Sequence, residues 1–339
     1  MTESARSTLS DAEKLAWLRL IRTDNVGPIT FRRLLERFGS AARALDALPD
    51  LARRGGRAQG LKPRAKAEAE AEIEAVRACG ARLLAWGEPD YPPLLAHVED
   101  APPLLSVLGH AGLLNKKAIA VVGARNASIN GCRFAERLAR DCGQGGLLVV
   151  SGMARGIDAA AHKGGLATGT LAVLGGGIDV IYPKENADLY RRIVGEGVLV
   201  SEVAPGTQPQ ARHFPRRNRL ISGVSRGVVV VEASPRSGSL ITARMALEQG
   251  RDVFAVPGAA MDPRARGTNH LIRQGAILTE SAEDVLSAFN ESPAPRLADR
   301  KAVDFKGNSP AAPGTANTSR PCSKAMRAVI SEPDRGLAS

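Results

Sequence analysis

Short apolar runs recur through the middle of the chain, and the segments between them have the length of helices. The runs are rich in Val, Leu, Ile and Ala and occupy residues 119–122, 147–150, 171–174, 198–200, 228–231 and 253–256. Continuous rather than alternating apolar character is typical of parallel strands that helices cover on both faces. The pattern predicts an α/β fold, an extended Rossmann-like doubly wound parallel sheet over residues 117–290. In such a sheet the ligand binds at the carboxyl ends of the strands.

A different pattern precedes this region. Apolar residues in 11–47 recur with helical spacing and are interrupted by the sequence NVGPI at 25–29, which predicts a helix, a tight turn and a second helix. The amides of that turn could contact a DNA phosphate, but the same pattern also fits an ordinary packing corner. With a further helix at 63–79, we expect a small all-helical domain at 11–80, after a disordered N-terminus at 1–10.

Two further segments are expected to be connections and not to form packed domains. Residues 81–116 contain two Pro-Pro-Leu-Leu sequences and are predicted to join the helical domain to the sheet. Residues 291–339 are rich in Pro, Ala, Ser and Asn, which is typical of a flexible linker and tail.

Charge and cysteine usage narrow the functional classes. The formal net charge is +11, which favours a polyanionic partner, although a basic solvated surface explains it equally well. The four cysteines form no CxxC pair and the five histidines are scattered, so no metal site is predicted. Because the sequence shows neither a secretion signal nor an apolar segment of bilayer length, we expect a cytoplasmic protein without a membrane partner.

The first strand of the predicted sheet leads into a loop with Gly123 and Arg125 and then into a helix. The G-x-G-x-x-G pattern is absent, and no acidic residue follows the second strand to hold a ribose, so NAD and FAD are not expected. A helix N-terminus with free amides still favours an anion, and the guanidinium of Arg125 adds donors beside it. We therefore predict a phosphate site at this helix N-terminus.

Three more loops are predicted on the same rim of the sheet. Their glycines let backbone approach a ligand, and the second loop also offers a hydroxyl and a guanidinium. Asp158 is expected to cap the following helix, and His162 to be a packing residue rather than a general base. Beside Gly123 and Arg125, the expected ligand contacts in these loops are Ser151, Gly152, Arg155, Gly156, Ser237, Gly238 and Ser239.

The densest basic stretch, at 212–219, contains four arginines around one aromatic ring. Arginine pairs with phosphate through two parallel hydrogen bonds and stacks on bases, and Phe214 could also stack. A solvated helix start is the alternative. The candidate contacts here are Arg212, Phe214, Arg217, Asn218 and Arg219.

No catalytic machinery is predicted. The G-x-S-x-G sequence at 223–227 precedes a strand, whereas the nucleophile elbow requires a strand before it and a helix after it. The G-x-x-x-x-G-K-[ST] phosphate loop is missing, and no paired carboxylates stand near the glycine loops. We therefore expect neither catalytic residues nor a cofactor.

Seven short motifs in a fixed order resemble the DprA/Smf family over residues 90–290. They are VGAR ending at Arg125, SGMARGID at 151–158, GIDVIYP at 177–183, SE at 201–202, FPRRNR at 214–219, SGSLITA at 237–243 and VPG at 256–258. The resemblance implies a non-catalytic single-stranded DNA-binding protein of natural transformation, or competence. Such a protein protects incoming DNA, assists loading of the RecA recombinase as a recombination mediator, and forms a homodimer. It also implies that the helical domain is SAM-like and that Arg125, Arg155, Phe214, Arg217, Asn218 and Arg219 contact DNA.

Two departures from the family pattern stand out. Members often have a lysine where this chain has Ala211, with Arg212 next to it, which leaves two alternatives: the contact has moved, or it has been lost. Many members also end in a winged-helix domain, which is expected to be missing here.

Two other functions are kept as alternatives. A nucleotide-hydrolysing enzyme of the lysine-decarboxylase-like Rossmann group would need a P-G-G-x-G-T-x-x-E loop. Here Pro235 begins the equivalent loop, and no Glu follows it until Glu248. A structural adaptor for recombination proteins would leave the rim unused.

Overall fold

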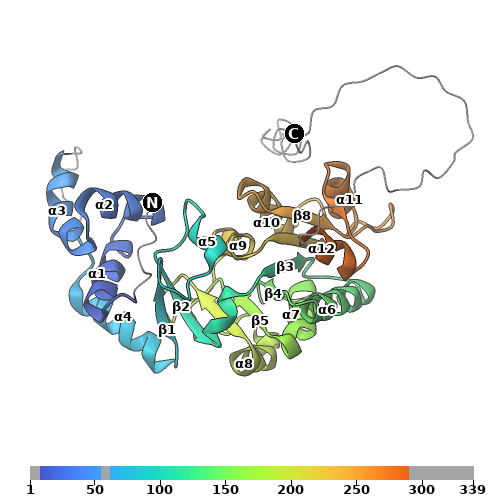
Figure 1. Cartoon of the computed structure of the whole chain (residues 1–339), viewed down its shortest axis with the longest axis horizontal. Coiled ribbons are helices and arrows are strands. Elements are labelled where there is room, and N and C mark those ends of the chain that lie inside the picture. Colours follow the sequence, from blue (N-terminus) through green and yellow to red (C-terminus); the bar gives the residue numbers. More distant parts are fainter. Residues whose placement is uncertain (1–7, 55–61, 290–339) are drawn as a thin grey trace, which may run out of the picture.

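The computed structural model describes residues 8–54 and 62–289. Most of the expected N-terminal segment (1–10) and the whole predicted linker and tail (291–339) lie outside these residues. Figure 1 shows a group of helices at the N-terminal end beside a larger body built around one sheet.

The N-terminal helices are α1 (Asp11–Ile21), α2 (Pro28–Phe38), α3 (Ala41–Arg54) and α4 (Lys66–Ala78). A capping box in which Ser10 and Glu13 bond to each other's backbone N–H begins α1. The turn to α2 requires Asn25 to adopt φ 64°, a left-handed conformation that Asn tolerates better than most residues. Phe31 packs edge-on against Trp17 in the core of this group. The predicted helix, tight turn and helix are confirmed.

One nine-stranded sheet forms the larger body, in the order β1-β2-β6-β5-β4-β3-β7-β8-β9. All six predicted strands are present and pair in parallel, which confirms the fold class. They are β3 (Ala118–Gly123), β4 (Leu148–Ser151), β5 (Thr170–Val173), β6 (Val198–Ser201), β7 (Gly227–Val231) and β8 (Asp252–Ala255). A short β9 (Ile277–Leu278) ends the sheet beside β8.

The segment predicted to be a plain connection contributes two strands. β1 (Arg82–Ala85) and β2 (Leu104–Gly109) pair antiparallel, and β2 pairs antiparallel with β6. Between them, the buried hydroxyl of Tyr91 donates to the Pro102 carbonyl oxygen and fixes the return of the chain. Residues 82–109 therefore extend the sheet instead of merely joining it to the helices.

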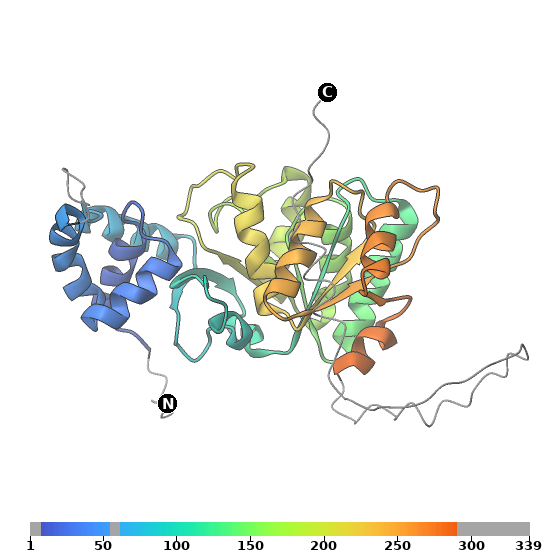
Figure 2. The same cartoon turned by 90° about the horizontal axis from the view of Figure 1, so that it is seen from above.

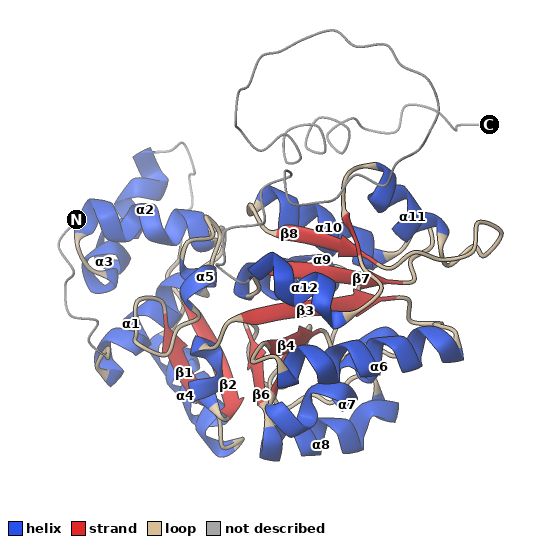
Figure 3. Ribbon diagram, turned by 45° about the vertical axis from the view of Figure 1, so that its right-hand side comes forward, coloured by secondary structure: helices blue, strands red, loops and turns tan. Residues whose placement is uncertain are grey.

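Helices cover both faces of the sheet, as Figures 2 and 3 show. α5 (Pro93–Ala96), α9 (His213–Val224), α10 (Gly238–Glu248) and α11 (Arg266–Arg273) pack on one face. The other face carries α6 (Ile129–Gln144), α7 (Ile157–Gly165), α8 (Ala187–Glu196) and α12 (Ala282–Phe289). The 3-10 turns are η1 (Ala111–Asn115), η2 (Leu166–Thr168) and η3 (Lys184–Asn186).

The central strand shows why its sequence is apolar throughout. Ala120 and Val122 of β3 pack into the core under α9 and α10, whereas Ile119 and Val121 pack under α6 and α7. Successive side chains of a strand point to opposite faces, so a strand covered on both sides must be apolar at every position. None of the helices in the described part of the chain has the length and apolar character that crossing a bilayer requires.

Candidate nucleic-acid interface

The order of the sheet reverses between β3 and β7. β3 leads into α6 on one face, and β7 leads into α10 on the other, so the loops that follow these strands diverge and leave a crevice between them. Crevices at such a switch point are the usual ligand sites of doubly wound sheets. The glycine loops predicted from the sequence lie at this carboxyl rim.

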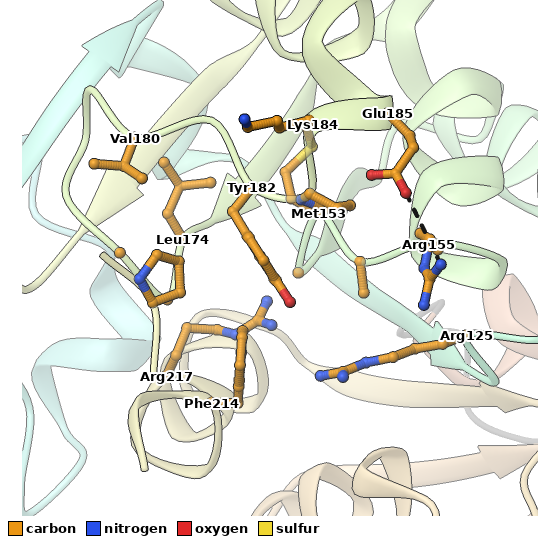
Figure 4. Close-up of a pocket in the computed structure, with 16 residues that line it drawn as sticks. Arg125, Met153, Arg155, Leu174, Val180, Tyr182, Lys184, Glu185, Phe214 and Arg217 are labelled. Carbon is orange, nitrogen blue, oxygen red and sulfur yellow. Dashed lines mark ion pairs between the residues drawn. The ribbon is translucent and has the colours of Figure 1, made fainter. Parts of the chain in front are cut away.

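A cavity of about 490 Å³ opens on the rim beyond β4 and β5 (Figure 4). We call it the first rim cavity. Its walls come from the loops after β3, β4 and β5 and from the start of α9. Its lining is Arg125, Gly152, Met153, Ala154, Arg155, Leu174, Gly175, Gly176, Val180, Tyr182, Pro183, Lys184, Glu185, Pro209, Phe214 and Arg217.

A second rim cavity, of about 530 Å³, lies at the switch point itself. Arg125, Phe214 and Arg217 line both cavities, so the two spaces meet along one wall. Its lining is Val122, Gly123, Ala124, Arg125, Asn126, Ala154, Asp158, Phe214, Pro215, Arg217, Asn218, Ile221, Ser234, Arg236, Ser237, Gly238, Ser239, Ile241, Thr242 and Arg264.

The shared wall is built around the ring of Phe214. The guanidinium carbon of Arg125 lies 5.0 Å from the ring centroid, and the ring of Tyr182 lies 5.9 Å from it at a tilted angle. Figure 4 shows Arg125, Tyr182 and Arg217 converging on this space from different elements. The wall therefore offers exposed π surface and guanidinium donors side by side.

Arg217 is the buried cation of the wall, with 6% of its surface exposed. Its Nη1 donates to the Val173 carbonyl oxygen over 2.9 Å, and its Nε has no hydrogen-bond partner within the described residues. Burial lowers its pKa to about 10, so it remains charged at neutral pH. The guanidinium fits because residue 152 is glycine, since a Cβ there would lie 2.5 Å from Arg217 Cζ.

Asp158 organises the second loop instead of capping the helix as predicted. The cap position of α7 belongs to Gly156, and the Asp158 carboxylate reaches back to accept from Gly152 N at 3.2 Å and Ala154 N at 3.3 Å. Burial raises the pKa of this carboxyl, and the nearby charge of Arg217 opposes that shift. The side chain thus holds the loop that faces both cavities.

Protein groups occupy the N-terminus of α6, where the sequence predicted a phosphate site. Ser128 caps the helix by accepting from Gly131 N, and its own N–H donates to Glu232 Oε2 over 2.8 Å. The Ser128 hydroxyl donates to the other oxygen of the same carboxylate. Glu232, at φ 52°, therefore takes the place of an anion at this helix.

Four predicted contacts line neither cavity: Arg219, Ser151, Arg212 and Gly156. The Arg219 guanidinium bonds to both carboxylate oxygens of Glu202 at 2.5 Å and to the Asp100 carbonyl oxygen at 2.7 Å. The Ser151 hydroxyl is buried and donates to the Val121 carbonyl oxygen. Arg212 is exposed, immediately before α9.

Most of the remaining predicted residues line one of the two cavities. Gly123, Asn218, Ser237, Gly238 and Ser239 line the second rim cavity, and Gly152 and Arg155 line the first. Gly156 lines neither but adopts φ 72°, which shapes the second loop.

His162 is buried in the core at 0% exposure. Thr170 Oγ1 donates to the Val149 carbonyl oxygen, so the His162 Nδ1–H donates to Thr170 over 2.8 Å. Burial lowers the pKa of the imidazole to about 3, so it is neutral at physiological pH. This is the packing role predicted from the sequence.

The lining residues that sequence reasoning missed include three cations and one aromatic residue. Tyr182 and Lys184 follow β5 through a long loop, and Arg236 and Arg264 lie beside the second cavity. Tyr182 belongs to the GIDVIYP motif, which was a usable signal for it. Among the described residues, Lys184 and Arg236 pair with no carboxylate, whereas Arg264 pairs with Asp262.

Comparisons with known proteins agree with this picture. The family model of DNA recombination-mediator protein A matches residues 82–290, and the model of the DprA-like N-terminal HHH domain matches residues 11–75. The DNA processing protein DprA of Streptococcus pneumoniae is 47% identical over 201 residues, which are 59% of this chain and 71% of that protein. Protein Smf of Synechocystis is 34% identical over 300 residues, 84% of this chain and 75% of that protein.

Two solved structures share the fold. DNA processing protein A from Streptococcus pneumoniae superposes with a TM-score of 0.66 at 36% identity, covering 83% of this chain and 98% of that one. The protein from Helicobacter pylori, whose structure concerns a single-stranded DNA binding mode, superposes with a TM-score of 0.55 at 28% identity. That match covers 58% of this chain and 91% of that one.

Proposed function

The chain belongs to the family of DNA recombination-mediator protein A, and from that premise we propose that it binds single-stranded DNA in the two rim cavities without changing it chemically. The observation that carries the proposal is the shared wall, where Arg125 and Tyr182 flank the Phe214 ring and Arg217 is held charged beneath it. The DNA-binding mode of the Helicobacter pylori relative supports the choice of ligand.

The cavities suit the two parts of a nucleotide. Guanidinium groups form charge-assisted hydrogen bonds with phosphate oxygens, and aromatic rings stack on unpaired bases. Arg125 and Phe214 provide both within one wall, and Lys184 and Arg236 add unpaired cations at opposite sides of it. A space of this size accepts single nucleotides, whereas a stacked base pair is too wide, so duplex DNA should bind more weakly.

The groups that could perform catalysis are committed to structure, which supports a binding role. Asp158 holds the second loop, His162 is buried and neutral, and Glu232 caps α6 through Ser128. A nucleotide-hydrolysing enzyme would need an acid at the start of α10. Glu248 is the last residue of that helix, about 15 Å away along its axis.

Three further properties complete the proposal. We propose that the protein acts in natural transformation, where it protects incoming DNA and helps to load the RecA recombinase in the cytoplasm. Homodimerisation is proposed as well. The edge strand β9 supports it, because Ile277 and Leu278 are 39% and 46% exposed on a sheet edge that no described strand covers.

Fluorescence anisotropy tests the binding function. A labelled oligothymidylate should bind more tightly than a duplex of equal length, and Arg125→Ala and Arg217→Ala should each weaken the binding. Equal affinity for both DNAs, or full affinity in both variants, would contradict the proposed site. Incubation with nucleoside monophosphates tests the enzymatic alternative, since release of free base would overturn the non-catalytic function.

A further inference from the structure

A groove of about 880 Å³ runs between α10 and α11, on the side of the second rim cavity away from the first. We propose that this α10–α11 groove binds backbone phosphates of the same single strand after it leaves the rim cavities. The inference rests on the proposed function and adds this groove to the surface that contacts DNA.

The groove concentrates positive charge. Arg236 and Arg244 lie on the α10 side, and Arg266 and Arg273 on the α11 side, with His270 between the latter two in sequence. All five side chains are exposed, and no carboxylate lines the groove. Four cations around one groove repel one another, so a bound polyanion would relieve that repulsion.

Ion pairing distinguishes these arginines from several others on the surface of the described chain. Some exposed arginines elsewhere among the described residues pair with neighbouring carboxylates, as Arg191 does with Asp188 and Arg192 with Glu196, whereas others, such as Arg133 and Arg137, do not. None of Arg236, Arg244, Arg266 and Arg273 forms an ion pair with a described residue. Their guanidinium groups are thus available for phosphate oxygens.

The groove continues directly from the second rim cavity. Arg236, Ser237 and Ile241 line both spaces, so a strand held at the switch point meets the groove without leaving the surface. At the junction Gly238 begins α10, and a Cβ there would meet nothing within 4 Å, so the path is open.

The lining also indicates which part of the strand binds. None of the residues that line the groove is Phe, Tyr or Trp, and its large aliphatic side chains are Leu240, Ile241 and Leu271. Stacking on bases is therefore left to the rim, and the groove recognises the charged backbone alone. Binding there should be independent of sequence and sensitive to salt.

The test compares two lengths of labelled oligothymidylate on the full-length protein, about 6 nucleotides to fill the rim and about 30 to reach the groove. The variant is Arg244→Ala with Arg273→Ala, two exposed residues outside the rim cavities. The matched control, Lys116→Ala with Lys117→Ala, removes the same charge beside the amino end of β3, at the opposite edge of the sheet. Thermal melts establish that both variants fold.

Loss of two phosphate contacts should lower the salt slope of the long oligonucleotide by about 1.4. The affinity ratio between unmodified protein and variant should then be about sevenfold larger at 50 mM than at 200 mM salt. The short oligonucleotide and the control should be unaffected. An unchanged slope overturns the inference and leaves the rim site intact, as expected if the groove instead receives a protein. Equal weakening at both lengths overturns it too, whereas failure of the unmodified protein to bind the short oligonucleotide refutes the proposed function itself.

Discussion

Gly152→Ala should impair DNA binding without removing any charged or aromatic group. The new Cβ would lie 2.5 Å from Arg217 Cζ and closer still to Nη1, so the guanidinium must leave its place beside the Val173 carbonyl. Such overpacking costs about 1–3 kcal/mol of folding stability. Losing one charge-assisted contact costs about 1.5–3 kcal/mol of binding, or about 10- to 150-fold in Kd.

The assay is anisotropy with oligothymidylate on Gly152→Ala, Arg217→Ala and the double variant. If the methyl group acts only by displacing Arg217, it adds no further loss once Arg217 is absent, so the two effects are not additive. Gly195→Ala is the control, because a Cβ at that position in α8 meets nothing within 4 Å. Folded Gly152→Ala protein with unchanged affinity, or fully additive effects, would refute the reasoning.

Three other variants distinguish residues that stabilise the fold from residues that contact DNA. Arg219→Ala should cost about 3–5 kcal/mol of stability by leaving the mostly buried carboxylate of Glu202 unpaired, yet keep the DNA affinity of the folded protein. Urea unfolding measures the stability and anisotropy the affinity, and a large loss of affinity would make Arg219 a DNA contact. His162 is neutral in the fold, so stability is full above pH 6.5 and is lost as pH falls toward 3, by about 2 kcal/mol between pH 7.5 and 5. Urea unfolding of His162→Asn at pH 7.5 and at pH 5 should no longer show this loss of stability. If the variant keeps the same pH dependence, His162 is not its cause. Phe214→Ala should weaken oligothymidylate binding by about 1–3 kcal/mol per stacked base, whereas less than a twofold change would exclude stacking there.

The sheet was predictable because each central strand is buried on both faces and reads as a continuous apolar run. β1 and β2 were missed because their short runs lie among prolines. The pairing of β2 with β6 also joins residues more than 90 positions apart in the chain, such as Ser106 and Ser201. Local sequence carries little information about such pairing.

The sequence predicts which loops form the site, but not which side chains contact one another within it. Arg125, Phe214 and Arg217 are brought together as the motifs suggested. The sequence cannot show that the carboxylate of Glu232 fills the anion position of α6, nor that Glu202 and Asp100 engage Arg219, because these contacts join residues distant in the chain. A basic motif thus mixes residues that face ligand with residues that hold the fold.

The location of the DNA is the central claim, and photocrosslinking tests it most directly. An oligothymidylate carrying one 5-iododeoxyuridine is irradiated in complex with the protein, and the crosslinked peptide is identified by mass spectrometry. Crosslinks to the ring of Phe214 or Tyr182 are predicted, and they should vanish when excess unlabelled single strand is added. Specific crosslinks confined to residues away from the carboxyl rim would contradict the account.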